Sequence, residues 1–333
     1  MPELSEQKFV SVAVVIPCFR VREQILDVLS SIGKEITNIY VIDDACPENS
    51  GRHVEKYCSD PRVTVVQHES NQGVGGATTT GYQLAIKHGA SIIVKMDGDG
   101  QMDAASIPNL IEPLLLGEAD YSKGNRFSRF EDLRGMPALR LLGNSLLSFI
   151  SKFSSGYWNV LDPTNGFTAI HANVVSALQI GKLSKRFFFE SDMLFQLNLI
   201  RAVVVDVPMR SRYLGESSNL RIRKVGLEFL IKHMRNAVKR IICSYFLHNV
   251  NIASTQLLFG LPMLMGGASF GLWKWTEAFE KAEVASSGTV MLAALPIIVG
   301  IQLLIAFMAY DIQSVPKQPI HLTQLTNDSI KEM

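Results

Sequence analysis

Two long stretches near the C-terminus carry no charged side chain, and they constrain the fold more than any other feature of this sequence. They are Ile252–Trp273, of 22 residues, and Val290–Tyr310, of 21 residues. A helix needs roughly 20 apolar residues to cross a bilayer. Core helices of soluble proteins are seldom so long and so free of charge, and here two follow one another. The sequence therefore predicts transmembrane helices at 252–273 and 290–310.

The charges around these stretches predict their orientation. Nine Lys or Arg and two Asp or Glu lie between Arg210 and Arg240, whereas Lys274–Gly288 holds two Lys and three Glu. Positive residues stay on the cytoplasmic side of a membrane. We therefore expect a multi-pass protein of the inner (cytoplasmic) membrane. Its N-terminal domain and both termini, including a tail at 311–333, should be cytoplasmic.

The segment 225–250, just before the first span, is basic and amphipathic. Its apolar residues recur at three- and four-residue spacing, which gives a helix one apolar face. Such helices lie on anionic membrane surfaces. The alternative is a helix packed on the preceding domain with a solvated basic face; the adjoining spans favour the membrane surface. The apolar positions are Leu227, Leu230, Ile231, Met234, Val238, Ile241 and Ile242, with Lys232, Arg235, Lys239 and Arg240 between them.

Residues 1–224 form a different kind of sequence, in which short apolar runs alternate with helical segments. Strand following helix in this way implies parallel strands joined by crossovers, as in a doubly wound, Rossmann-like α/β sheet. Ligands of such sheets bind beyond the carboxyl ends of the strands, so polar residues there are the candidates for function. The expected strands are Val12–Pro17, Ile39–Asp43, Val63–His68 and Ile92–Asp97, and the expected helices are Gln24–Ile32, Gly51–Cys58 and Gly75–His88.

Composition excludes several classes of protein. Hydrophobic residues make up 47% of the chain and charged residues 19%, so the bulk of it can bury a core and is not disordered. A net charge of +1 gives no reason to expect a nucleic-acid partner. The four cysteines show no C-x-x-C spacing, which disfavours a zinc site or a disulfide framework. The first ten residues hold two Glu and no apolar run, so no signal peptide is expected.

The clearest chemical signal is MDGDGQ, at the end of the fourth expected strand. Asp97 and Asp99 are two residues apart in an extended turn, so both carboxylates can reach one divalent cation. The amide oxygen of Gln101 could be a further ligand. Mg²⁺ and Mn²⁺ prefer oxygen ligands and usually share them with substrate phosphates. The motif therefore predicts a Mg²⁺ or Mn²⁺ cofactor and a substrate that carries phosphate.

Two other strand ends carry weaker signals. Asp43 and Asp44 could hold ribose hydroxyls or a base edge, or an Asp here could instead cap the following helix. NQGVGG, at Asn71–Gly76, places glycines before a helix, where backbone N–H groups can bind phosphate. Neither the dinucleotide pattern G-x-G-x-x-G nor a P-loop lysine is present, which disfavours hydride transfer and kinase chemistry.

Together these segments resemble the family 2 glycosyltransferases from Val12 to about Lys224. VVIPCF, VIDDACPENS, HESNQGVGGA and MDGDGQ are similar to the opening strand, paired-Asp, Asn-Gly-x-Gly and metal motifs of that family. The resemblance implies a glycosyltransferase A-type fold and a nucleotide-sugar donor, either a UDP- or a GDP-sugar. It implies that Asp97 and Asp99 hold metal and diphosphate. The nucleotide-binding residues implied are Pro17, Asp43, Asp44, Asn71, Gly73, Gly75 and Asp97.

Later motifs resemble the acceptor side of the family and one subgroup of it. GNRF, with Arg126, is similar to a Gly-x-Arg segment; DPTNGF, with Asp162, and FFFESD, with Glu190 and Asp192, resemble acceptor motifs. SRYLGESSNLR and the paired C-terminal spans resemble the dolichyl- and polyprenyl-phosphate sugar transferases. The resemblance implies a membrane-bound, inverting enzyme that transfers a single sugar to polyprenyl (undecaprenyl or dolichyl) phosphate on the cytoplasmic face. Its catalytic residues would be Asp97, Asp99, Asp162, Glu190 and Asp192.

The acceptor sets which side chains the reaction needs. A lipid monophosphate is already anionic, so it needs cations that hold it more than a general base. Guanidinium binds phosphate in bidentate fashion, so the candidates are Arg126, Arg212, Arg221 and Arg223, although positive-inside topology alone could explain the last two. If the acceptor were a hydroxyl, Asp162, Glu190 or Asp192 could serve as base. The alternative for Glu190 and Asp192 is a stabilising charge at a helix N-terminus.

Three functions remain open on the sequence alone. The first is transfer of a sugar to polyprenyl phosphate. The second is a membrane-anchored glycosyltransferase that acts on a hydroxyl of a lipid-linked glycan or another cell-envelope acceptor. The third is a non-catalytic membrane scaffold with a degenerate transferase domain, against which the intact Asp97, Asp99 and Gln101 speak. A homo-oligomer is compatible with all three.

Overall fold

The computed structural model describes residues 10–127, 138–209 and 222–322, which form two compact units. The first unit, here the N-terminal unit, extends to Ala237 and includes the segment from Pro316 onward. The second, here the hairpin unit, is Val238–Val315. The predicted boundaries, at 224 and 311, divide the chain differently. The first half of the amphipathic helix and the tail both group with the N-terminal unit.

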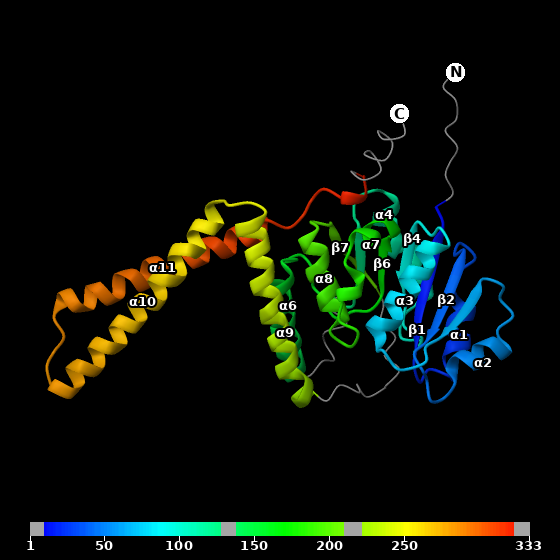
Figure 1. The fold of residues 1–333 in the computed structure, drawn as a ribbon, viewed down its shortest axis with the longest axis horizontal. Helices are drawn as coiled ribbons and strands as arrows, with labels where there is room; N and C mark the ends of the chain where they lie inside the picture. Colours follow the sequence, from blue (N-terminus) through cyan, green and yellow to red (C-terminus); the bar gives the residue numbers. More distant parts are fainter. Residues whose placement is uncertain (1–9, 128–137, 210–221, 323–333) are drawn as a thin grey trace, which may run out of the picture. The chain divides into compact units, whose positions relative to one another are not determined.

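The described part of the N-terminal unit contains one seven-stranded sheet, in the order β3-β2-β1-β4-β6-β5-β7 (Figure 1). β1 pairs in parallel with β2 and β4, whereas β6 is antiparallel to both β4 and β5. The first four strands end within two residues of the predicted ends, which confirms the α/β fold; the sheet is mixed because β6 runs the other way. The strands are β1 Val12–Cys18, β2 Asn38–Asp43, β3 Val63–Gln67, β4 Ile92–Lys95, β5 Tyr121–Asn125, β6 Thr168–His171 and β7 Val204–Pro208.

Apolar residues form the central strands because helices cover both faces of the sheet. Val14 and Ile16 of β1 belong to the main apolar core, together with residues of α1 (Ile25–Ser31) and α4 (Ile107–Leu115). On the opposite face lies α3 (Val74–Lys87), which comes so close that a Cβ at Gly81 would lie 2.2 Å from Val15 Cγ1. This arrangement leaves the carboxyl ends of β1, β2 and β4 at one edge, where the predicted site residues lie.

The remaining helices of this unit connect the strands. The predicted helices Gln24–Ile32, Gly51–Cys58 and Gly75–His88 correspond to α1, α2 and α3, and those predictions are confirmed. α8 is the helix that carries the FFFESD motif. The connecting helices are α2 Ser50–Tyr57, η1 Ala104–Ser106, α6 Ala138–Ser155, α7 Ala172–Ala177, η2 Ile180–Lys182 and α8 Phe189–Leu199.

The hairpin unit contains two helices that are long and apolar enough to cross a membrane, α10 (Ile252–Lys281) and α11 (Ser287–Gln313). Their most apolar windows have mean hydropathies of 1.2 and 2.6, and only 11% of each window is buried within the protein. A core helix of a soluble protein would be mostly buried. α10 continues past the predicted end at Trp273 because Glu277 forms ion pairs with Lys274 and Lys281, one helical turn away on either side.

Glycine allows α10 and α11 to pack closely. A Cβ at Gly267 would lie 2.9 Å from the carbonyl oxygen of Ala293, and one at Gly300 would lie 2.7 Å from the backbone nitrogen of Leu264. The neighbouring Gly266 has nothing within 4 Å of its Cβ position. Gly267 and Gly300 therefore lie in the helix–helix contact, as small residues do in membrane helix pairs.

The predicted amphipathic segment is α9 (Ile222–Ile242), followed by a π-helical turn at Cys243–Leu247. α9 packs on the N-terminal unit through His233, Asn236 and Ala237, which are buried. The apolar side chains of the same part of the helix, Leu227, Leu230, Ile231 and Met234, are exposed. α9 therefore does pack on the domain, as the alternative held, but through His233, Asn236 and Ala237, while much of its apolar face stays exposed. Contact of the exposed apolar side chains with a membrane stays a prediction.

Candidate active site

Asp97 and Asp99 follow β4 in a tight turn. The turn is possible because Gly100 adopts a φ of 77°, and the backbone N–H of Gln101 donates to Asp99 Oδ1 at 3.0 Å. The Asp97 side chain is 33% exposed. Within the described residues no three His, Cys, Asp or Glu side chains are grouped to hold a metal by themselves. A partly exposed Asp97 with Asp99 two residues away fits a hard cation, such as Mg²⁺, that takes its other ligands from substrate phosphates and water.

A buried lysine lies between Asp97 and α8. Lys95 Nζ is 2.8 Å from Asp97 Oδ1 and 3.2 Å from Glu190 Oε1, and the Lys95 side chain is only 1% exposed. Burial by itself would lower the pKa of Lys95, but the two carboxylates outweigh it and raise the pKa above its ordinary value. Sequence reasoning did not single out this residue. The available signal was a lysine inside an otherwise apolar strand, IIVK, two residues before Asp97.

The structure brings Arg126 and Asp162 together as a bidentate ion pair. Arg126 Nε is 2.7 Å from Asp162 Oδ2, and Nη2 is 3.0 Å from Asp162 Oδ1. Asp162 is fully buried, whereas the Arg126 side chain is 31% exposed. A guanidinium held by a buried carboxylate is fixed in orientation, and guanidinium groups bind phosphate in bidentate fashion. The prediction of Asp162 as a base stays untested, and its position favours the role of orienting Arg126.

The loop with Asp162 also approaches the metal motif. A Cβ at Gly166 would lie 2.5 Å from Lys95 Nζ and 2.8 Å from Asp97 Oδ2. Only glycine allows the backbone to pass so close to this pair. Lys123 of β5 is fully buried and donates to the carbonyl of Asn165, which holds the loop from the other side. Burial lowers the pKa of Lys123 to about 8.

The paired Asp43 and Asp44 organise two loops. Asp43 accepts hydrogen bonds from the backbone of Cys46 at 2.7 Å and of Gly51 at 2.6 Å, so it caps the start of α2, as the alternative interpretation proposed. Asp44 accepts from the backbone N–H groups of Gln72 at 2.8 Å and Gly73 at 2.7 Å. Both Asp residues are buried. Their contact with a nucleoside stays a prediction.

His68 and Asn71 also hold Asp44. His68 Nδ1 lies 2.9 Å from Asp44 Oδ1, and the Asn71 amide donates to the Asp44 carbonyl at 3.1 Å. Pro17 lies in β1 opposite Ile42, one residue before the end of the strand. The structure thus gathers Asp44, Asn71 and Gly73 at one edge; that they bind a nucleotide stays a prediction.

The glycine loop differs from the open phosphate site that the sequence suggested. The backbone N–H groups of Gly75 and Gly76 donate to the Lys185 carbonyl, at 2.9 and 3.2 Å. A Cβ at Gly73 would lie 2.4 Å from that carbonyl oxygen, and one at Gly75 would lie 2.2 Å from the Ser184 carbonyl oxygen. Because Gly73 and Gly75 have no Cβ, the backbone of Ser184 and Lys185 can pack directly against this loop. A phosphate could reach the N–H groups of Gly75 and Gly76 only if that segment moved.

Glu190 and Asp192 both lie in the first turn of α8, but the structure gives them different neighbours. Glu190 faces Lys95. Asp192 accepts from the Asn236 side chain at 2.9 Å and from the backbone of Ser184 at 2.8 Å, so it anchors α9 and the 184–186 segment. This geometry favours an architectural role for Asp192 over the predicted role as a base.

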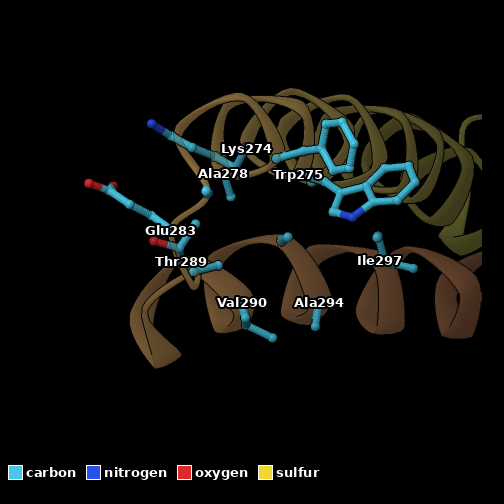
Figure 2. Close-up of a pocket in the computed structure, with 13 residues that line it drawn as sticks. Lys274, Trp275, Ala278, Glu283, Thr289, Val290, Ala294 and Ile297 are labelled. Atoms are coloured by element: carbon cyan, nitrogen blue, oxygen red, sulfur yellow. The ribbon is translucent and has the colours of Figure 1, made fainter.

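Three predicted acceptor-binding residues are not placed. Arg212 and Arg221 lie outside the described residues, as does the side chain of Arg223. The hairpin unit has a cavity of its own, of about 690 Å³, between α10 and α11 (Figure 2). Trp275, Ala278 and Ile297 are among its lining residues, and none of the predicted site residues is.

Several known proteins are similar to this chain in sequence. Residues 13–178 match the family described as Glycosyl transferase family 2. A dolichyl-phosphate N-acetylglucosaminyltransferase of Methanococcus voltae that uses UDP-N-acetylglucosamine is 27% identical over 213 residues, which cover 60% of this chain and 84% of that protein. An undecaprenyl-phosphate mannosyltransferase of Micrococcus luteus is 29% identical over 185 residues, covering 54% of this chain and 75% of that protein.

A solved structure is similar in fold. It is glucosyl-3-phosphoglycerate synthase from Mycobacterium tuberculosis in complex with Mn²⁺, UDP and glucosyl-3-phosphoglycerate. The TM-score is 0.52 at 18% identity, and the match covers 69% of this chain and 79% of that one. This likeness confirms the A-type fold. The family match shows that residues 13–178 form a family 2 glycosyltransferase domain, and the two relatives show that the chain is similar to polyprenyl-phosphate sugar transferases.

Proposed function

We propose that this protein is a membrane-bound, inverting glycosyltransferase that moves a single sugar from a nucleotide-sugar donor to polyprenyl phosphate on the cytoplasmic face. The observation that carries the proposal is the bond between Asp192 and Asn236. It joins α8, which presents Glu190 to the site, to α9, whose exposed apolar side chains suit a membrane surface. An active site beside such a helix can receive a phosphate head group whose tail stays in the bilayer.

The site residues divide between donor and acceptor. Asp97 and Asp99 would hold Mg²⁺ or Mn²⁺, which stabilises the charge that develops on the diphosphate leaving group. Asp44, with Asn71 and Gly73 around it, would contact the nucleoside. Arg126, oriented by Asp162, would hold the lipid phosphate, whose oxygen attacks the anomeric carbon as the bond to the diphosphate breaks. The attacking oxygen already carries negative charge, so no side chain has to remove a proton.

The tail supports the proposed topology. The backbone N–H groups of Ile320 and His321 donate to Asp120, at 2.9 and 3.0 Å, and His321 Nδ1 lies 2.7 Å from Asp120 Oδ1. Asp120 lies just before β5, in the N-terminal unit. A tail that binds this unit must lie on the same side of the membrane. Two crossings, by α10 and α11, would return the chain to that side.

The topology can be tested with a single cysteine at Ala282, in the turn between α10 and α11. We expect it to react with a membrane-impermeant maleimide in intact spheroplasts. Lys185→Cys, on the N-terminal unit, serves as the matched control and should react only after permeabilisation. The reverse pattern would contradict the proposed orientation.

The activity can be tested with full-length protein in vesicles that contain undecaprenyl phosphate. Each of a panel of UDP- and GDP-sugars is added with Mg²⁺ or Mn²⁺, and the product is a lipid that carries one sugar. Transfer to polyprenyl phosphate alone would support the proposal. Transfer only after a lipid-linked glycan is added would favour the hydroxyl-acceptor alternative. Nucleotide-sugar binding without any transfer would favour the scaffold.

A further inference from the structure

Lys95 is a charged side chain in the interior of the N-terminal unit, and the proposed reaction has not yet given it a role. Its ammonium contacts Asp97 from the turn after β4 and Glu190 from α8. Gly166, from the loop that follows Asp162, lies against the same nitrogen. An ammonium removed from water is costly unless it is paired and hydrogen-bonded. Lys95 meets that condition because the turn after β4 and α8 each bring a carboxylate to it.

We propose that Lys95 is a positioning residue that acts as the internal counter-ion of the active site. It holds Asp97 beside Glu190 and reduces the negative charge that an incoming diphosphate meets. The inference rests on the proposed function, because it requires a divalent cation at Asp97 and Asp99.

The contacts of Asp97 show how its position is fixed. Oδ1 of Asp97 accepts from Lys95, while Oδ2 lies where a Cβ at Gly166 would be only 2.8 Å away. The ion pair with Lys95 therefore holds Oδ1 in place. Oδ1 is committed to Lys95 and Oδ2 lies toward the Gly166 backbone, so the carboxylate cannot turn away from the site without breaking the ion pair.

Charge accounting gives the second part of the role. Lys95 places one positive charge against the carboxylates of Asp97 and Glu190. This charge lowers the excess of negative charge that an incoming diphosphate meets beside these two carboxylates. Without Lys95 the cation alone would bind more tightly, because a positive charge that repels it would be gone from a partly buried site. The diphosphate would bind less well, and Asp97 would lose its restraint.

The test uses full-length protein in detergent, with Lys95→Met to remove the charge and Lys95→Arg to keep it. Binding of Mn²⁺ alone is measured from the electron paramagnetic resonance signal of the free ion, and thermal unfolding is measured in chelator. For Lys95→Met we expect Mn²⁺ to bind about tenfold more tightly or better, as the loss of one nearby charge predicts. We also expect kcat to fall about a hundredfold. Lys95→Arg should bind Mn²⁺ within about threefold of wild type, since it keeps the charge.

This pattern separates positioning by charge from a merely structural role, which would lower stability and turnover but would not tighten Mn²⁺ binding. Folded Lys95→Met protein with unchanged or weaker Mn²⁺ binding would overturn the inference, as would a Lys95→Arg protein that behaves like Lys95→Met. If Lys95→Met does not fold, the double variant Lys95→Met/Glu190→Gln removes one charge of each sign. It should fold and bind Mn²⁺ within about threefold of wild type; a tenfold departure would overturn the inference.

The controls also separate this inference from the proposed function. If wild-type protein binds Mn²⁺ but the Lys95 variants do not show the expected changes, the cation site is supported and the proposed role of Lys95 is wrong. Lack of Mn²⁺ binding by wild type and all variants would overturn the cation site and the role of Lys95 together.

Discussion

The N-terminal unit and the hairpin unit differ in where their most telling side chains lie. In the N-terminal unit, charged groups such as Lys95, Lys123 and Asp162 are buried and hydrogen-bonded at one end of the sheet. In the hairpin unit, large apolar side chains such as Phe259 and Leu292 are exposed along the helices. A domain in water buries apolar side chains and can bury charges that are paired, whereas a helix in lipid exposes its apolar side chains. The chemistry should therefore depend on the interior of one unit and anchoring on the exterior of the other.

The largest effect should come from the metal motif. We expect Asp99→Ala to lower transfer by more than about a thousandfold, because loss of a ligand removes the cation that stabilises the leaving group. EDTA should do the same to wild type. Asp103→Asn is the matched control: Asp103 caps η1, and Asn caps a helix equally well, so activity should be kept. Full turnover of Asp99→Ala protein in chelator would remove the motif from the chemistry.

A smaller effect should come from the acceptor side of the same interior. Arg126→Ala is expected to raise KM for polyprenyl phosphate about tenfold to a hundredfold, the cost of a lost charge-assisted hydrogen bond, while donor KM changes little. Lys at this position should rescue only in part, because a point charge cannot replace the planar guanidinium. The measurement is a pair of titrations, one of donor and one of lipid phosphate. A raised donor KM with an unmoved lipid curve would assign Arg126 to the diphosphate.

The hairpin unit offers a matched pair of neighbouring glycines. Gly267→Val should destabilise the hairpin by about 1–3 kcal/mol, since the new side chain would meet the Ala293 carbonyl in the helix contact. Gly266→Val, which meets nothing within 4 Å, should be close to neutral. Thermal unfolding in detergent would measure both. Equal effects of the two substitutions would contradict the helix contact and weaken the contrast between the units.

The smallest effect should come from pH acting on buried histidine. Burial lowers the pKa of His233 to about 4, and burial together with His321 lowers the pKa of His171 to about 4. Unfolding returns each pKa to about 6.5, so the unfolded chain binds more protons below that pH. The free energy of unfolding should therefore fall as pH drops from about 6.5 toward 4. The expected loss is about 1 kcal/mol per histidine over the first pH unit below 6.5.

The control for this prediction is His233→Gln, which keeps a polar side chain beside Ser154 and does not titrate. Unfolding in detergent at pH 7 and pH 5.5 should then show a smaller pH dependence than wild type. If the two proteins lose stability equally over this range, His233 does not carry the effect.

Several elements could be predicted because local pattern determines them. The runs that became β1, β2, β3 and β4 are apolar and bounded by turn residues, and the two uncharged stretches became α10 and α11. The second half of the sheet gave weaker signals. β6, for example, has only four residues and runs antiparallel between β4 and β5, a position that no local pattern encodes. Its orientation depends on strands that are far apart in the sequence.

The sequence by itself determined the α/β class, the apolar hairpin and the presence of Asp97 and Asp99 at a strand end, because each depends on residues close together in the chain. Only the tertiary structure decided the partners. Lys95 meets Glu190 across 95 residues, Arg126 meets Asp162 across 36, and His321 meets Asp120 across 201. Such pairs form because packing of the sheet, α8 and the tail brings their segments together, and burial then requires that each charge find a partner.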